Sequence, residues 1–171
     1  MKILSYSLWE SLERFGGIRY PEQIQLTDQQ KEKVKGIEES DLSWEEIGNN
    51  GHNIIWFKLN LDSLDFDISD GVAVDVQLVI DEKFYQLHIG LAEDLKGLGL
   101  GTKICKSLVI DLGHIYTGKG RVHNPIIWDL LKKLEDDPRI ECHHNEIGVL
   151  CVSKLNPDRE KLISMFRGDR T

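Results

Sequence analysis

FYQLHIGLAEDLKGLGLGTKICKSLVIDL, residues 84–112, is the stretch that decides the fold. Residues 84–91 have the aromatic and branched composition that is typical of a buried or half-buried strand. From residue 102 onward, apolar side chains recur on one face of a helix and charged ones on the other. Between strand and helix, glycine occupies every second position, at Gly97, Gly99 and Gly101. The sequence therefore predicts a strand, a glycine-rich loop and a helix in direct succession.

Alternating glycines before a helix leave main-chain N–H groups uncovered by side chains. A phosphate can then approach several N–H groups together with the positive end of the helix dipole. Lys96 and Lys103 add positive charge on either side of the loop. The pattern predicts a cradle for a diphosphate. The alternative that the glycines leave open is a tight turn that packs strand against helix without a ligand.

The glycine spacing narrows the kind of phosphate motif. A Walker loop requires G-x-x-x-x-G-K-S/T and a Rossmann fingerprint requires G-x-G-x-x-G, and residues 97–103 supply neither. Residues 96–101 do fit R/Q-x-x-G-x-G/A, with Lys96 in place of Arg or Gln. In its strand–loop–helix setting this segment resembles the acyl-CoA loop of the GNAT superfamily of N-acyltransferases. Leu91 adds to the resemblance, because that family usually ends its central strand with Val or a similar residue at this distance before the loop.

The resemblance implies an α/β (α+β) fold: a GNAT-like mixed, mostly antiparallel sheet with helices on both faces and splayed central strands. Period-two runs at 52–61 and 72–81 predict an antiparallel meander before residue 84. Residues 41–51 are ambiguous and are interpreted as a helical turn around Trp44. We expect one GNAT-like domain over residues 1–171, with a helical N-terminal part at about 1–50, an acyl-CoA-binding core at about 52–155 and a C-terminal helix at about 156–167.

The second half of the chain follows the same family order. Residues 114–117 predict a short strand, and Asn124-Pro125 opens a further helix with Asn as its cap. Residues 139–143 and 147–154 predict a hairpin before the last helix. The resemblance covers about the last two-thirds of the chain, and the first fifty residues are harder to align.

The resemblance also implies roles for individual positions. The N–H groups of Gly97–Thr102 would hold the pyrophosphate of acyl-CoA, and the main chain at Ile89–Leu91 would pair with the pantetheine arm. The N–H of Leu91 would polarise the thioester carbonyl, and Asn124 would contact the pantetheine arm. The cofactor-binding residues expected on this basis are Ile89, Leu91, Lys96, Gly97, Leu98, Gly99, Leu100, Gly101, Thr102 and Asn124.

The general acid departs from the family pattern. Many members carry a Tyr seven residues after the Asn, where it protonates the leaving thiolate, and Leu131 stands there in this chain. Either Tyr116, His123 or water donates the proton instead, or acyl transfer is weak or absent. Because a thiolate is a moderate base with a pKa near ~8.5, loss of the acid need not abolish turnover.

A general base is needed because an alkyl ammonium, with a pKa near ~10.4, is mostly unable to attack at neutral pH. The candidates are His88, Tyr85, Gln86 through a water, and Asp75. His88 has the most suitable intrinsic pKa. Its odd offset from Leu91 directs it to the other sheet face unless a bulge intervenes, so a solvated or core-edge histidine is the alternative. The catalytic residues expected are His88, Tyr85, Tyr116 and Leu91.

The composition of the chain restricts the binding partners and the cellular compartment that we expect. The chain has 171 residues, a formal net charge of −8 and three cysteines. An acidic chain disfavours a nucleic-acid partner, and with it a toxin-like transferase that acts on charged tRNA. No apolar run approaches the ~20 residues of a membrane span, and the first residues turn polar too early for a signal peptide. The sparse, odd set of cysteines predicts reduced thiols, so we expect a cytoplasmic protein.

The adjacent Cys142, His143 and His144 lack a second cluster at ligand spacing, so no metal site is expected. The expected function is an acyl-CoA-dependent N-acyltransferase, using acetyl-CoA as co-substrate and acylating a primary amine by direct attack in a ternary complex. The alternative is a catalytically inactive acyl-CoA-binding or protein-interaction module of the same fold, which Leu131 favours. The expected partners are a small-molecule amine or a protein amino group, without nucleic acid or membrane, and a homodimer is compatible with the sequence.

Overall fold

The computed structural model describes residues 24–49, 54–60, 63–66, 68, 74–81, 84–118 and 125–168. The predicted helical segment before residue 24 lies outside these residues, as do His123 and Asn124. The side chains of Asp75 and His88 are likewise outside the described part, although both residues belong to described strands.

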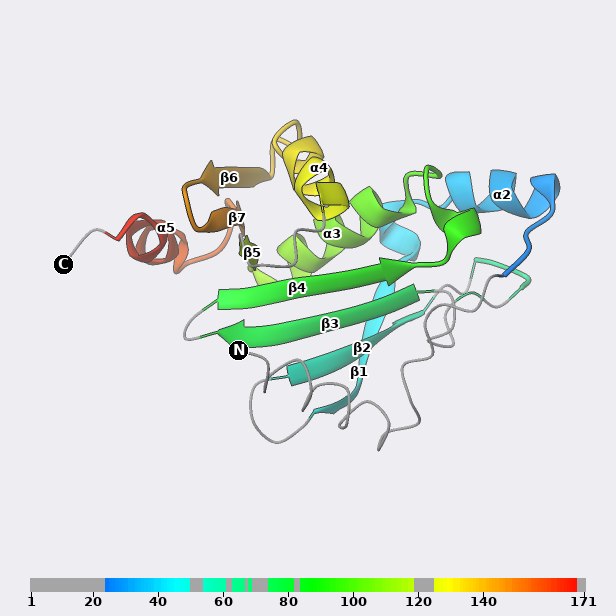
Figure 1. Cartoon of the computed structure of the whole chain (residues 1–171), viewed down its shortest axis with the longest axis horizontal. Helices are drawn as coiled ribbons and strands as arrows, with labels where there is room; N and C mark the ends of the chain where they lie inside the picture. Colours follow the sequence, from blue (N-terminus) through cyan, green and yellow to red (C-terminus); the bar gives the residue numbers. More distant parts are fainter. Residues whose placement is uncertain are drawn as a thin grey trace.

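The described strands form one seven-stranded sheet in the order β1-β2-β3-β4-β5-β7-β6 (Figure 1). The strands are β1 (Ser43–Asn49), β2 (Ile54–Asn60), β3 (Val74–Asp81), β4 (Phe84–Leu91), β5 (His114–Gly118), β6 (Ile140–His144) and β7 (Gly148–Ser153). Neighbouring strands are antiparallel except β4 and β5, which are parallel. The predicted mixed α/β class with a mostly antiparallel sheet is therefore confirmed.

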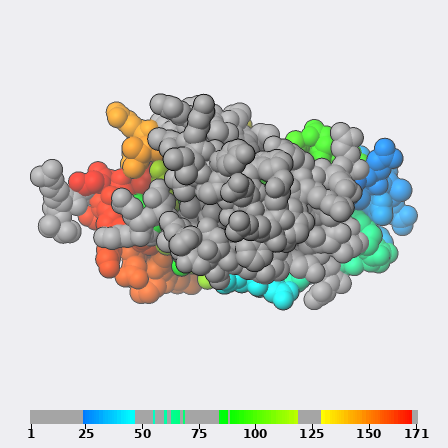
Figure 2. Space-filling model, turned by 60° about the horizontal axis from the view of Figure 1, so that its bottom comes forward, coloured from blue at the N-terminus to red at the C-terminus, as the bar shows by residue number. Residues whose placement is uncertain are grey.

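The described helices lie between and beside these strands. They are α2 (Asp28–Lys35), α3 (Leu100–Leu112), α4 (Pro125–Leu134) and α5 (Arg159–Arg167), with short 3-10 turns η1 (Glu39–Asp41) and η2 (Glu93–Leu95). Thr27 caps α2 in a reciprocal capping box with Gln30. Helices α2 and α5 lie at opposite ends of the molecule, drawn in blue and red (Figure 2).

One element differs from the sequence-based expectation. The interpretation of residues 41–51 as a helical turn is wrong, because η1 ends at Asp41 and Ser43–Asn49 forms strand β1. This strand pairs antiparallel with β2, from Ser43 opposite Asn60 onward, and its register shifts between Glu46 and Gly48. The pairing partner supplied by β2 gives strand structure to a segment whose own pattern is ambiguous.

Strands β4 and β5 are parallel and share a short register. Within the described residues, the register between them consists of one pair, Gln86 opposite Tyr116. Strand β4 continues beyond this pair to Leu91 and stays paired with β3 over its whole length, from Phe84 opposite Asp81 to Leu91 opposite Val74. Among the described residues, the carboxyl half of β4 therefore has its registered neighbour in β3.

Buried side chains gather in two clusters on opposite faces of β5. The larger cluster surrounds α3 and α4 and takes Ile115 from β5, while the smaller one surrounds α5 and takes Tyr116. Because successive strand residues point to opposite faces, this alternation shows that β5 is covered on both sides. Within the described residues, no helix has the length and apolar character needed to cross a membrane.

Cys142 and Cys151 form a disulfide across the β6–β7 pair, where they stand directly opposite each other. The expectation of three reduced thiols is therefore wrong for these two residues. Cys105 is free and fully buried in the core, and burial raises the pKa of its thiol to about 12. The pairing was invisible in the sequence because it depends on the register of the hairpin.

Candidate functional site

The glycine-rich loop is built around two left-handed residues. Gly97 has φ +76° and Gly99 has φ +83°, a region that L-residues with a side chain rarely adopt. A Cβ added at either position would meet no atom within 4 Å. These two glycines therefore serve the backbone conformation, and the space beside them is open.

Gly101 has a different role from the other two glycines. A Cβ at this position would lie 3.2 Å from Leu130 Cδ1 and 3.3 Å from Leu91 Cδ1. The third glycine thus lets the first turn of α3 approach α4 and the end of β4 closely. Gly101 thus fits the packing interpretation of the pattern, while the open space beside Gly97 and Gly99 leaves the cradle for a diphosphate a prediction.

The loop exposes a run of main-chain donors. Within the part of the chain that the structure describes, no acceptor takes the N–H groups of residues 97–102. The flanking N–H groups are both used: Lys96 donates to Glu93 O at 3.1 Å, and Lys103 donates to Gly99 O at 3.3 Å. Because the first N–H groups of a helix carry its positive dipole end, this stretch is suited to an anion.

The two lysines beside the loop have different surroundings. Lys96 is exposed, and its ammonium lies 2.6 Å from Glu93 Oε2. Lys103 does not direct its charge to the loop as predicted, because its Nζ donates to the main-chain oxygens of Lys35, at 2.8 Å, and Ile37. Lys96 is therefore the nearer source of positive charge for a ligand on the loop.

The expected pantetheine-binding strand ends directly before this loop. Ile89 and Leu91 are half-buried in β4 and pack against the larger core cluster. Their registered partners lie on β3, at Val76 and Val74. The structure thus brings these two residues and the loop residues Lys96–Thr102 into one continuous segment at the carboxyl end of β4.

The expected catalytic tyrosines lie at the other end of β4. The ring of Tyr85 stacks on His114, with centroids 4.8 Å apart and planes at 22°. Six residues of strand, or about 20 Å, separate Tyr85 from Leu91. Tyr116 is buried against Phe84 and Phe166, and its hydroxyl donates to Ile147 O at 3.1 Å. The structure therefore does not bring these tyrosines to the loop.

His88 and Leu131 complete the expected set. The main chain of His88 lies in β4 opposite Gln77. Leu131, at the position of the family's tyrosine, is fully buried in the larger core cluster. An apolar core side chain there cannot donate a proton, so no acid is supplied from this position of α4.

Sequence reasoning missed two residues that shape this region, His114 and Asp94, and the contact that Lys103 makes. His114 accepts the Tyr85 N–H through Nε2 at 3.2 Å. Asp94 accepts the Leu26 N–H at 2.8 Å, and Lys103 holds the end of α2. Each contact joins residues far apart in sequence, so no local pattern could have found it. The only signal was the placement of a charged residue on either side of the glycines.

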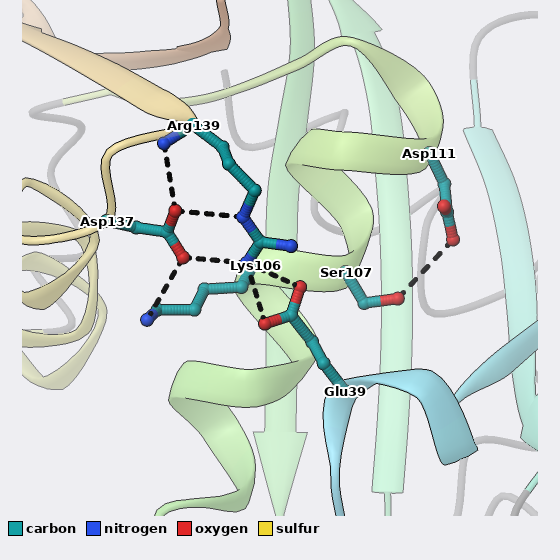
Figure 3. A network of polar contacts seen from close by, with 6 residues as sticks. All are labelled: Glu39, Lys106, Ser107, Asp111, Asp137 and Arg139. Carbon is teal, nitrogen blue, oxygen red and sulfur yellow. Dashed lines mark hydrogen bonds and ion pairs between the residues drawn. The ribbon is translucent and has the colours of Figure 1, made fainter.

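A separate polar network joins α3 to η1 and to the turn before β6 (Figure 3). Arg139 Nε donates to Asp137 Oδ1 at 2.9 Å, and its NH2 donates to Glu39 Oε2 at 2.9 Å. Lys106 Nζ lies 3.3 Å from Asp137 Oδ2. The hydrogen bonds from Arg139 outweigh burial and hold the pKa of Asp137 well below its usual range. The network joins η1, α3 and the turn before β6, and its charges are paired, so it is suited to holding these elements together.

The same helix is tied to β1 by a shorter chain of hydrogen bonds. Trp44 Nε1 donates to Ser107 Oγ at 2.9 Å. Ser107 Oγ in turn donates to Asp111 Oδ2 at 3.3 Å (Figure 3). Ser107 is buried and has no histidine among these partners. The chain therefore anchors α3 against the sheet and offers no activated nucleophile.

The Cys-His-His run is divided between different partners. Cys142 is in the disulfide, His143 Nε2 lies 2.8 Å from Glu141 Oε1, and His144 pairs with Glu135. A search of the described residues for three or more clustered metal-ligating side chains found none.

Comparisons with protein-family models, with curated proteins and with solved structures found no match. The function is therefore inferred from the loop and from the strands that carry it.

Proposed function

We propose that the protein is an acyl-CoA-dependent N-acyltransferase of the GNAT type. The observation that supports this most directly is the run of N–H groups at residues 97–102, which find no acceptor among the described residues. Gly97 and Gly99 leave open space beside it. A pyrophosphate settled on this run would receive several hydrogen bonds and the helix dipole, with Lys96 close by.

The short register between β4 and β5 supports the second part of the proposal. A pantetheine arm leaving the loop would run along the main chain of Ile89–Leu91, on the side where β4 has no registered neighbour among the described residues. Added-strand pairing of this kind uses main-chain hydrogen bonds and needs no special side chain. The N–H of Leu91 would then polarise the thioester carbonyl.

The proposed reaction is transfer of an acetyl group to a primary amine, on a small molecule or a protein. The neutral amine nitrogen attacks the thioester carbon, a C–N bond forms and the C–S bond breaks. The CoA thiolate leaves, and the ammonium proton passes to a base or to water. His88 is the proposed base, and water is the proposed donor to the thiolate, because Tyr85 and Tyr116 are engaged far from Leu91.

A binding module without catalysis is the second candidate, and the fully buried Leu131 favours it. Two measurements separate the candidates. Thermal unfolding with acetyl-CoA tests binding, since ligand at ~100 times its dissociation constant adds about 2.7 kcal/mol. Release of free thiol from acetyl-CoA over a panel of amines then tests transfer. Binding without thiol release would favour the module, and no stabilisation by any acyl-CoA would overturn both.

A further inference from the structure

Helix α2 contacts the glycine-rich loop at the end where the loop begins. The N–H of Leu26, just before α2, donates to Asp94 Oδ2 at 2.8 Å. Lys31 Nζ, on α2 itself, lies 3.7 Å from Asp94 Oδ1. Asp94 belongs to η2, the turn that leads into the loop, so these contacts fix the entry to the loop.

The same helix contacts the loop where it ends. Lys103 lies in the first turn of α3, and its Nζ donates to Lys35 O at 2.8 Å and to Ile37 O. These oxygens stand at the carboxyl end of α2, where main-chain carbonyls lack partners within the helix and the dipole favours a cation. Both effects stabilise the Lys103 ammonium at this end of α2.

The two contacts bracket the segment that carries the exposed N–H groups. Two glycines in this short segment give it more conformational freedom than other residues would. Figures 1 and 2 show α2, in blue, beside the green segment that leads from β4 into the loop. An anion site made of main-chain N–H groups binds well only when those groups are already aligned, because ordering them on binding costs free energy.

We propose that α2 holds the glycine-rich loop in its anion-binding conformation, with Asp94 and Lys103 as positioning residues. The proposal rests on the proposed function for its ligand, acyl-CoA, and not for the restraint itself. Lys103 acts through the loop and does not touch the phosphates. This explains why the ammonium group of a lysine next to a phosphate cradle donates its hydrogen bonds to main-chain carbonyl groups.

The test compares Lys103→Met with Lys103→Arg and with Lys35→Met. Arginine keeps donors that can reach the two carbonyls. Lys35→Met is the matched control, because it removes another lysine side chain and leaves the Lys35 main-chain oxygen in place. Within the described residues, that side chain pairs with the exposed Glu32. Asp94→Ala and Asp94→Asn test the other end, since Asn keeps an acceptor for the Leu26 N–H.

Two readouts are measured for each folded variant: ¹⁵N order parameters of residues 97–102 without ligand, and the dissociation constant for CoA. In Lys103→Met and Asp94→Ala we expect the order parameters to fall from about 0.85 toward 0.6 or below. We expect CoA binding to weaken about tenfold, with KM for acetyl-CoA raised and kcat within about twofold. Lys103→Arg, Asp94→Asn and Lys35→Met should stay close to the unaltered protein.

Unchanged loop order in both Lys103→Met and Asp94→Ala would overturn the proposal, whatever happens to affinity. A loss of affinity alone would mean that Lys103 contacts the ligand directly. If the loop loosens as expected but the unaltered protein binds no acyl-CoA, the restraint stands and the proposed function falls. Asp94→Ala decides the outcome by itself should Lys103→Met fail to fold.

Discussion

The main-chain N–H of Tyr85 donates to Nε2 of His114, 3.2 Å away across the parallel β4–β5 pair, and the two rings stack at 4.8 Å. Nε2 accepts this bond through its ring lone pair. His114 is 7% exposed. The histidine thus accepts a strand N–H next to the registered pair of Gln86 and Tyr116.

Replacing His114 by Phe should lower the free energy of unfolding by about 1–3 kcal/mol, because it keeps a ring but leaves the Tyr85 N–H without its acceptor. Urea denaturation followed by circular dichroism measures the change. His144→Phe is the matched control on the exposed edge strand β6, where loss of the Glu135 contact should cost at most about 0.5 kcal/mol. Equal effects of the two substitutions would contradict the role assigned to His114.

Asp137 should make stability depend on pH in acid. Its pKa is held below the unfolded value of about 3.9, chiefly by hydrogen bonds from Arg139. The stabilisation is therefore fully present above about pH 4 and is lost as pH falls through the lower folded pKa. At pH 7, Asp137→Asn should cost about 1–3 kcal/mol, because it weakens hydrogen bonds to a charged partner.

The measurement is the difference in unfolding free energy between the unaltered protein and Asp137→Asn, followed from pH 7 to pH 2. The difference should shrink below about pH 4, because the carboxylate is protonated in the unfolded chain while the lowered pKa keeps it ionised in the folded chain. Asp136→Asn, at the exposed neighbouring position, should show a difference within about 0.5 kcal/mol throughout. A constant difference at Asp137 over this range would exclude the proposed ion pairing.

The Cys142–Cys151 disulfide predicts one free thiol in the native, oxidised chain. Alkylation in denaturant without reductant should modify Cys105 alone, and mass spectrometry should count one label before reduction and three after it. Reduction should also lower stability by about 2–3 kcal/mol, since the bridge closes a short loop in the unfolded chain. Three labels without reductant would show that the pair is not bonded.

The sequence predicts those features that depend on local pattern. Strand β4, the glycine loop and α3 follow from residues 84–112 because periodicity and glycine positions lie within one stretch. Strand β1 was missed because Glu45 and Glu46 interrupt the alternation of apolar and polar residues that indicates a strand. Its pairing with β2 is what makes this segment a strand. The contact of Lys103 with Lys35 and Ile37 joins residues more than sixty positions apart. No sequence motif based on residue spacing covers so large a separation.

The acid and base could not be predicted for the same reason. Tyr85 and Tyr116 are plausible proton donors in the sequence, yet the parallel register, with Tyr116 opposite Gln86, puts both near the amino end of β4 and in different core clusters. Tyr116 then meets Phe166 from α5, fifty residues later in the chain, and becomes part of a core. Which side chains reach Leu91 is decided by strand register, which the local pattern does not contain.

Gly97→Ala gives the sharpest test of the loop, because the chain contains a matched control. Gly97 has φ +76° and Gly168, after α5, has φ +74°, and a Cβ at either position would meet no atom within 4 Å. Alanine in a left-handed conformation costs roughly 1–2 kcal/mol, so both variants should lose similar stability. Only Gly97→Ala should also weaken CoA binding, by about tenfold or more, because its methyl group and any relaxation of φ disturb the N–H groups that the phosphates need. Calorimetric titration with CoA separates the two effects. Equal affinity in the two variants would mean that the open space beside the loop holds no phosphate.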